Sequence, residues 1–382
     1  MPTTVRSYSK INLGLAIGAP RADGFHSLVT LYQTLALCDG VTVWAELAAE
    51  TRIRLRCNDG RVPCDGRNTV WKMVDKALER LGLTAQVDVF IQKNLPVQGG
   101  MGAGSANAAA ALLGLEKELR LEWSAEDRLS LAAEVGSDVP LFLIGGSVLG
   151  TDRGQVVEAV RDVTLDGMEE IWCVMARPSI GVSTPAAFRE WDRRFADATD
   201  PDLHNPPIRD TLEQLSRTYA SVFALKSEFR PSGSGASGIL PDPSSADEMR
   251  NIPENLQGLS REQHHTSLPS AKNPDESGIE NDLAENSLLA LVRTGIENDF
   301  ETVVFPQYPL LREIKRTLMG SPATEEGAVY TALSGSGSAL FGLYRSQAVA
   351  SAAQQRLQQQ GVEAIVTKTM PRARYWSEMF AE

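Results

Sequence analysis

A run of four glycines separates a strand pattern from an alanine-rich helix pattern, and these are Gly99, Gly100, Gly102 and Gly104. Before it, residues 86–93 alternate apolar and polar side chains, which predicts a strand, and after it residues 105–119 are rich in Ala, Leu and Glu, which favours a helix. Glycine permits φ > 0 and close approach of backbone N–H groups, and a helix start adds unpaired N–H groups and the positive end of its dipole. Residues 96–106 therefore predict a phosphate-binding turn, the alternative being a flexible connection.

This glycine run matches neither common nucleotide-binding motif, because no Gly-Lys-Ser/Thr follows it and its third glycine comes one residue too early for G-x-G-x-x-G. A second glycine turn, residues 334–338, lies between strand patterns at 329–333 and 339–344. Alone it would fit an ordinary hairpin. Two such turns in one chain favour a single cleft that both of them face.

The rest of the chain alternates strand and helix patterns, which predicts an α+β fold. We expect further strands at 171–176 and 362–369, and helices at 124–135 (with Ser124 as N-cap), 285–294, 310–318 and 347–360. A new buried strand after a polar stretch places a domain boundary near residue 165. The expected domains are residues 1–165 and 166–382.

One segment, residues 231–278, has the composition of a disordered insertion. Pro, Gly and Ser make up 20 of its 48 residues and it has no aromatic side chain, so it cannot bury enough apolar surface to offset the entropy of ordering it. His264 and His265 lie inside it and are expected to be solvated rather than metal ligands.

Charge and cysteine content exclude several classes of protein. The chain has 49 acidic and 37 basic residues, a net charge of −12, which argues against a general nucleic-acid binder but not against a local anion site. Its four cysteines form no C-x-x-C pair, so free thiols and a cytoplasmic location are expected. No apolar run approaches the roughly 18 residues of a membrane helix.

Three shorter segments carry candidate polar groups, each with a structural alternative. Lys10 and Asn12 share one face of a strand pattern, which is either a site or a solvated edge. Residues 21–26 predict an Asp-Gly turn that ends in His26, which is either part of a site or an ordinary surface residue. Asp138 either faces the cleft as a proton acceptor or caps the short helix that Pro140 would begin.

These segments occur in a fixed order: Lys10-Ile-Asn12, Arg21-Ala-Asp-Gly-Phe-His26, Lys93-Asn-Leu-Pro96 with its glycine run, Gly136-Ser-Asp-Val-Pro140 and Leu333-Ser-Gly-Ser-Gly337. In this order they resemble the motifs of GHMP small-molecule kinases, well over residues 6–190 and more loosely over 280–370. The resemblance implies a ribosomal-protein-S5-like N-terminal domain and a ferredoxin-like C-terminal domain around a central cleft. The Arg-Ala-Asp-Gly-aromatic-His string resembles that of members which act on a cytidine diphosphate ester of methylerythritol in isoprenoid precursor biosynthesis.

The resemblance also implies roles for single residues, with ATP and Mg²⁺ as cofactors. Asp138 is the expected base at the substrate 2-hydroxyl and Lys10 the charge stabiliser. The expected substrate-binding residues are Asn12, Phe25, His26, Thr184 and Phe188. His26 is expected to hydrogen-bond the cytosine, and Phe25 and Phe188 to stack on its two faces. The expected ATP-binding residues are Asn68, Lys93, Pro96, Val97, Gln98, Gly99, Gly100, Met101, Gly102, Ala103, Gly104, Ser105 and Ala106. The magnesium ligands are not defined, although Ser105 is a candidate. The expected partner is the small-molecule substrate alone, with no nucleic acid or membrane. The protein is expected to be a monomer or a weak homodimer.

The chain also departs from the family pattern. Phe25 replaces the usual tyrosine, and Gln98, Ala103 and Ala106 stand where glycine, glycine and serine are usual. An alanine forced to φ > 0 at position 103 would cost roughly 1 kcal/mol. Two rival functions remain: a GHMP kinase for mevalonate, homoserine or a sugar, and a protein of this fold that binds nucleotide without catalysis.

Overall fold

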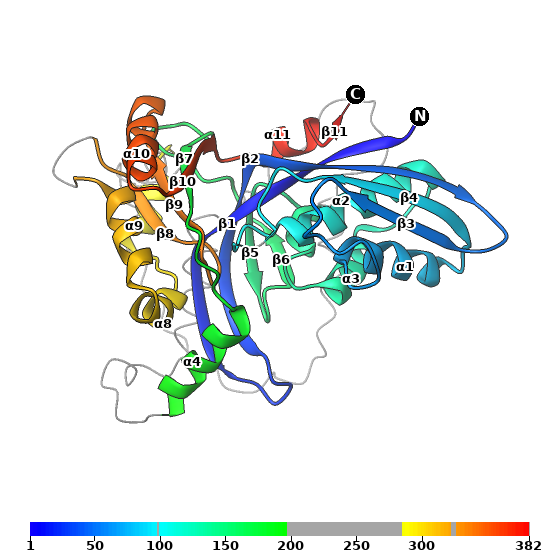
Figure 1. The fold of residues 1–382 in the computed structure, drawn as a ribbon, viewed down its shortest axis with the longest axis horizontal. Helices are drawn as coiled ribbons and strands as arrows, with labels where there is room; N and C mark the ends of the chain where they lie inside the picture. The colour runs from blue at the N-terminus through cyan, green and yellow to red at the C-terminus, as the bar shows by residue number, and fades with distance from the viewer. Residues whose placement is uncertain (98, 197–284, 322–325, 382) are drawn as a thin grey trace, which may run out of the picture.

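The computed structural model describes residues 1–97, 99–196, 285–321 and 326–381 (Figure 1). The expected insertion at 231–278, with His264 and His265, lies outside the described residues, as does Gln98. Within the described residues, no helix is long and apolar enough to cross a membrane.

The first part of the fold is a seven-stranded sheet dominated by one long hairpin. Strands β1 (Thr3–Pro20) and β2 (His26–Leu47) are antiparallel and pair from Thr3↔Val43 to Pro20↔His26. The order continues through β4 (Ala85–Gln92) to β3 (Arg52–Cys57), which is parallel to β4, while β5 (Ser147–Thr151) pairs with β2 and β6 (Val156–Ala159) with β5. The strand expected at 86–93 is thus confirmed as β4.

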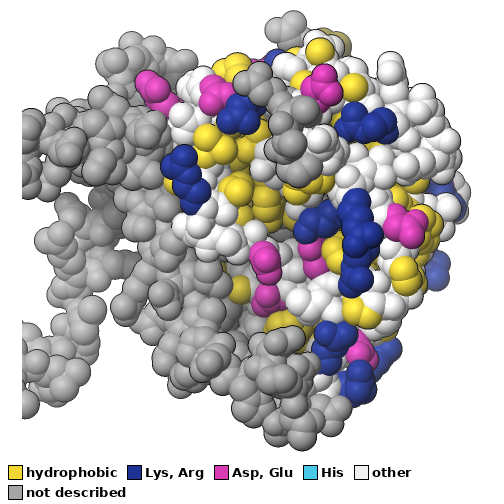
Figure 2. Space-filling model, turned by 90° about the vertical axis from the view of Figure 1, so that its left-hand side faces the viewer, with side chains coloured by type: hydrophobic (Ala, Val, Ile, Leu, Met, Phe, Trp, Pro, Cys, Tyr) yellow, Lys and Arg dark blue, Asp and Glu magenta, His cyan; other side chains and the backbone are white. Residues whose placement is uncertain are grey.

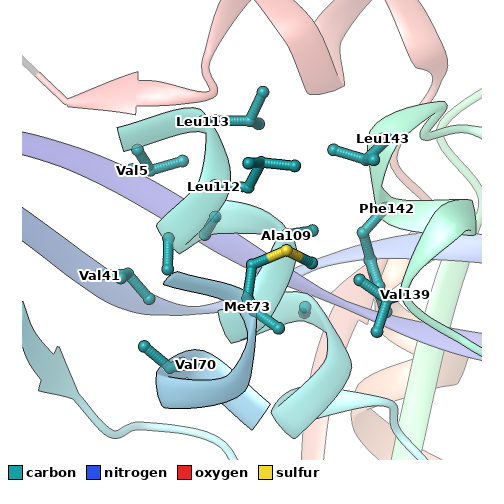
Figure 3. Packing of buried hydrophobic residues seen from close by; sticks show 14 of the residues in the cluster. Val5, Val41, Val70, Met73, Ala109, Leu112, Leu113, Val139, Phe142 and Leu143 are labelled. Carbon is teal, nitrogen blue, oxygen red and sulfur yellow. The ribbon is translucent and has the colours of Figure 1, made fainter. Parts of the chain in front are cut away.

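Three helices cover one face of this sheet. Helix α2 (Ala103–Leu119) packs on β1 and β2, α1 (Thr69–Leu81) packs on α2, and α3 (Ala125–Val135) adjoins α1. The small side chains of α2 let it approach the sheet closely, and a Cβ on Gly114 would lie 2.6 Å from Cγ2 of Val43. Figure 3 shows the resulting core, with Val5, Val41, Val70, Met73, Ala109, Leu112, Leu113, Val139, Phe142 and Leu143.

Helix α3 begins as the sequence predicts. The Ser124 side chain accepts a hydrogen bond from the backbone N–H of Asp127, and Glu126 and Asp127 lie in the first turn. After α3 comes a short 3-10 helix, η1 (Pro140–Leu143), with Pro140 at its start.

The second part is a four-stranded antiparallel sheet in the order β10 (Glu363–Lys368), β7 (Trp172–Arg177), β9 (Leu340–Tyr344) and β8 (Tyr330–Leu333). Its helices are α4 (Thr184–Ala196), α7 (Ser287–Arg293), α8 (Phe300–Gln307), α9 (Pro309–Met319) and α10 (Gln347–Gln359). The expected strands, and the expected helices α7, α9 and α10, are confirmed here. The sequence did not predict α8, because its Thr-Val-Val-Phe-Pro run is typical of a strand followed by a break.

The C-terminus returns to the first sheet. Helix α11 (Arg372–Ser377) and strand β11 (Phe380–Ala381) lie beside β1, with Val5↔Phe380 in register. The hydroxyl of Tyr375 donates to the carbonyl of Phe142 (2.7 Å). The end of the chain therefore belongs to the first sheet, while the boundary near residue 165 stays a prediction.

The surface charge is uneven. Figure 2 shows Lys and Arg side chains (dark blue) gathered on the face that lies at the left of Figure 1, beside apolar side chains and a few acidic ones. The acidic excess of the whole chain therefore does not describe each face of the molecule.

Candidate active site

The glycine run forms a tight turn that ends at the start of α2. Gly99, Gly100 and Gly102 have φ of 128°, 76° and 69°, a region that only glycine adopts readily. Gly102 is the N-cap and Ala103 is the first helical residue, two positions earlier than predicted. The concern that Ala103 is held at φ > 0 is wrong, because the left-handed conformation falls on Gly102 instead.

The N-terminus of α2 is open to an anion. Gly102 provides no side-chain cap, and the first N–H bonded within this turn is that of Ala106, to the carbonyl of Gly102 (2.9 Å). The N–H groups of Ala103, Gly104 and Ser105 are those that a helix start leaves without an intrahelical partner. Such groups, together with the helix dipole, form a binding site for phosphate.

The two glycine turns contact each other, while the single cleft that both were expected to face stays a prediction. The Ser334 hydroxyl donates to the carbonyl of Gly100 (2.9 Å), and a Cβ on Gly100 would lie 2.0 Å from the Ser334 carbonyl oxygen. Asn298, buried just before α8, holds the second turn by donating to the carbonyls of Leu333 (2.8 Å) and Gly335 (2.9 Å). The turn expected to bind phosphate is thus held by residues of the second part of the fold.

Lys10 lies directly beneath this turn. Its ammonium donates to Oδ1 of Asn12 (2.6 Å) and lies 3.4 Å from Oδ2 of Asp138. Its aliphatic stem packs against Gly102, where a Cβ would come within 3.1 Å of Lys10 Cγ. Because Lys10 and Asn12 are only 3% and 2% exposed, the alternative of a solvated edge is wrong.

Asp138 faces the Lys10 ammonium from the loop before η1. The N-cap of η1 is Val139, without a side-chain hydrogen bond, so Asp138 is not the cap that the alternative required. Its Oδ1 accepts a hydrogen bond from the Tyr32 hydroxyl (3.1 Å), and its side chain is 34% exposed. Burial and the nearby Asp138 carboxylate raise the pKa of Tyr32 well above its usual value, which keeps that hydroxyl a donor. Sequence reasoning missed Tyr32, which the fold brings opposite Asn12 on the neighbouring strand.

The Arg21–His26 motif forms the tip of the β1–β2 hairpin. Gly24 has φ of 79° there, and the Phe25 ring is 52% exposed, with the Arg153 guanidinium 4.8 Å from its centroid. His26 is only 7% exposed, so it is not an ordinary surface residue. Its ring stacks on Phe188 (centroids 4.8 Å apart, planes at 17°), and its Nε2 lies 2.6 Å from Oδ1 of Asp192.

Helix α4 links the hairpin tip to the glycine turns. Its first residue, Thr184, shares a hydrogen bond with Ser336 of the second turn (Oγ1 to Oγ, 2.6 Å), whereas Phe188 and Asp192 contact His26. Thr184 and Asp192 are eight residues apart, about 12 Å at 1.5 Å per helical residue. One rigid element therefore sets the spacing between the two ends of the site.

Two residues expected at the adenosine side are bound within the protein. Asn68 caps α1, accepting from the N–H of Val70 (2.9 Å) and donating to the carbonyl of Pro63 (2.7 Å). The Lys93 ammonium forms a buried ion pair with Asp39, whose other oxygen accepts the N–H groups of residues 94 and 95 (both 2.7 Å). Contact of Asn68 or Lys93 with ATP stays a prediction.

The remaining expected ATP-binding residues differ in exposure. Met101, Ala103 and Ala106 are buried in the core and offer only backbone atoms, while Gly104 is exposed and Pro96, Val97 and Ser105 are half-buried. Among the described residues, no three His, Cys, Asp or Glu side chains come together as a metal cluster.

Comparison with known proteins defines the class. Residues 68–146 match the model of the GHMP kinases N terminal domain and residues 272–363 that of the GHMP kinases C terminal domain. A solved structure of 4-(cytidine 5'-diphospho)-2C-methyl-D-erythritol kinase has the same fold, with TM-score 0.57 and 22% identity over 96% of this chain and 98% of that one. The chain belongs to the GHMP kinase family, and the expected two-domain fold is confirmed.

Two relatives are more specific. A 4-diphosphocytidyl-2-C-methyl-D-erythritol kinase of Nocardioides sp. is 43% identical over 196 residues, which are 51% of this chain and 64% of that relative, just under two thirds of its length. The kinase of the same name from Rhodococcus jostii is 41% identical over 225 residues, 58% of this chain and 69% of the relative.

Proposed function

We propose that this chain transfers the γ-phosphoryl group of ATP to the 2-hydroxyl of 4-diphosphocytidyl-2-C-methyl-D-erythritol, a step in isoprenoid precursor biosynthesis. The observation that carries the proposal is the Lys10–Asp138 pair, 3.4 Å apart directly beneath an uncapped helix N-terminus. The names of the relatives support the choice of substrate. The four free cysteines support a reducing compartment, and we place the enzyme in the cytoplasm as a monomer or weak homodimer.

The reaction is a direct in-line transfer. The substrate oxygen forms its bond to the γ-phosphorus while the bond from phosphorus to the β,γ-bridging oxygen breaks, and the hydroxyl proton passes to the Asp138 carboxylate. Phosphoryl transfer depends mainly on positioning and charge stabilisation, so a weak base such as aspartate is sufficient.

The residues around Asp138 hold both reactants in place. The Tyr32 hydroxyl donates to one oxygen of Asp138 and leaves the other, beside Lys10, for the substrate. The buried Lys10 ammonium stabilises negative charge that develops on the attacking oxygen, and Asn12 fixes the ammonium. The first N–H groups of α2 hold the ATP phosphates.

Mg²⁺ fits this donor set as a phosphate-bound ion. When bound, it neutralises charge on the β- and γ-phosphates. The Ser105 hydroxyl, in the first turn of α2, is the protein oxygen that would hold it.

The hairpin tip suits the base of the substrate. Pyrimidine recognition needs an aromatic face and a directional polar group, and Phe25 and Phe188 supply the first and His26 the second. Phe25 keeps the stacking surface of the usual tyrosine without its hydroxyl. The separation of about 12 Å along α4 is of the order of a nucleoside diphosphate, which supports binding of the hydroxyl end near the glycine turns and of the base at His26.

A coupled ADP-release assay tests the proposal. Purified protein with ATP and Mg²⁺ is offered 4-diphosphocytidyl-2-C-methyl-D-erythritol, mevalonate and homoserine at equal concentrations. Turnover of the cytidine substrate alone is expected. Turnover of another alcohol instead would assign a different GHMP kinase activity, and ATP binding without any turnover would assign a non-catalytic role.

A further inference from the structure

Helix α4 contacts the His26 ring through two side chains that lie one helical turn apart. Phe188 stacks on the ring at 4.8 Å, and Asp192 Oδ1 lies 2.6 Å from Nε2. Residues four apart lie on the same face of a helix, so both contacts come from one side of α4. His26 itself is on β2, so the contact with Asp192 joins two residues that are 166 positions apart in the chain.

We propose that Asp192 is a positioning residue that fixes the tautomer of His26 and so makes the site selective for cytosine over uracil. The selectivity part rests on the proposed function, while the contact with His26 stands on geometry alone.

The argument follows from hydrogen-bond chemistry. An ionised carboxylate only accepts hydrogen bonds, so at 2.6 Å the His26 Nε2 must carry its proton and donate it to Asp192. In the neutral ring, Nδ1 is then an acceptor. No described residue hydrogen-bonds to Nδ1, which leaves it for a ligand.

An acceptor at Nδ1 distinguishes the two pyrimidines. Cytosine presents an exocyclic amino group, which is a donor, where uracil presents a carbonyl oxygen, which is an acceptor. The tautomer that Asp192 selects therefore pairs with cytosine and sets two acceptors against each other for uracil, and an unpaired polar group in a closed site is costly.

Asp192 is not needed to fold α4. Its side chain is 41% exposed, whereas Ala187 and Trp191 on the same helix are 3% and 6% exposed and pack into the core. A loss of binding on its removal would therefore report on His26 and not on a collapsed helix.

Three variants separate the possibilities. Asp192→Ala removes the acceptor, and Asp192→Asn keeps the shape but pairs with either tautomer because its amide both donates and accepts. Glu190→Ala, on the same helix and paired with Arg193 instead of His26, is the matched control. Binding of cytidine 5'-diphosphate and uridine 5'-diphosphate by calorimetry gives a readout without turnover.

For Asp192→Ala we expect the Kd for cytidine 5'-diphosphate and the KM for the cytidine substrate to rise severalfold, because part of the His26 population then takes the other tautomer and presents a donor at Nδ1. The preference for cytidine over uridine should shrink in both Asp192 variants, with kcat and the KM for ATP unchanged. A Kd and a preference equal to those of Glu190→Ala would overturn the proposal.

Nitrogen-15 NMR of the histidine side chains tests the tautomer directly, with His26→Gln used for assignment. The wild type should show a protonated Nε2 and a bare Nδ1 at His26, and Asp192→Asn a mixture of tautomers. A bare Nε2 in the wild type would overturn the proposal. If the protein binds cytidine 5'-diphosphate through this tautomer but turns over no substrate, the proposed function fails and the role of Asp192 stands.

Discussion

Replacing Gly100 with alanine tests whether the two glycine turns must touch for phosphoryl transfer. Two costs arise at this position. An alanine at φ of 76° is strained by about 1 kcal/mol, and its Cβ would lie 2.0 Å from the backbone carbonyl oxygen of Ser334. Carbon and oxygen must separate by roughly 1 Å or more to reach van der Waals contact.

That displacement falls on the first glycine turn, the proposed phosphate site. The Ser334 side is held by its own N–H bond to the Ala339 carbonyl (2.9 Å) and by Asn298, so Gly100 and the start of α2 are expected to move. A misplacement of about 1 Å costs on the order of 100-fold in rate. We therefore expect kcat in the coupled ADP-release assay to fall by about that factor.

Gly82→Ala is the matched control. Gly82 ends α1 at φ of 62° with nothing within 4 Å of its Cβ position, so alanine carries the same strain there without a clash. Gly82→Ala should lower the melting temperature by a few degrees and leave kcat unchanged. A Gly100→Ala enzyme with kcat within about twofold of this control, a difference of under 1 kcal/mol in the barrier, would refute the reasoning.

Three further predictions concern buried groups. Lys93→Met leaves the fully buried Asp39 without its cation, so the free energy of unfolding in urea should fall by roughly 3 kcal/mol. The affinity for ATP should stay nearly intact. Weaker ATP binding at unchanged stability would instead support contact of Lys93 with adenosine. Burial raises the pKa of Asp299 to about 6, so the folded state retains a proton that the unfolded chain releases, and the free energy of unfolding should decline as pH rises from about 4 to about 6. Asp299→Asn should flatten that decline, and an unchanged slope would contradict the assignment. Tyr32→Phe removes the hydrogen bond to Asp138 and should lower kcat by about tenfold at unchanged KM for ATP, whereas wild-type kcat would show that Asp138 needs no such support.

Local patterns predicted many of the helices and strands, although not β2, β3, α1 or α4. The period-two alternation of β4, the Ser124 cap of α3 and the Ala-rich run of α2 each indicate one element without help from the rest of the chain. Helix α8 was missed because its β-branched and aromatic residues favour a strand, and packing of Phe300, Val303 and Val304 into the core overrides that preference.

The site was only partly predictable. The motifs indicated Lys10, Asp138 and both glycine turns, because each stands in a short string of unusual composition. Tyr32 and Asp192 have no such string: each acts through a contact with a residue more than 100 positions away, which only the fold brings together. Lys93 is a third case: its motif indicates a ligand contact, which stays a prediction, and only the fold shows that its ammonium pairs with the buried Asp39.

The measurement that tests the central claim most directly is the single-turnover rate of Asp138→Asn with ATP, Mg²⁺ and 4-diphosphocytidyl-2-C-methyl-D-erythritol at saturation. If Asp138 accepts the hydroxyl proton beside Lys10, the rate should fall by about 10² to 10⁴ while the Kd for ATP stays near that of the wild type. A rate near the wild-type value would show that the Lys10–Asp138 pair does not perform the transfer.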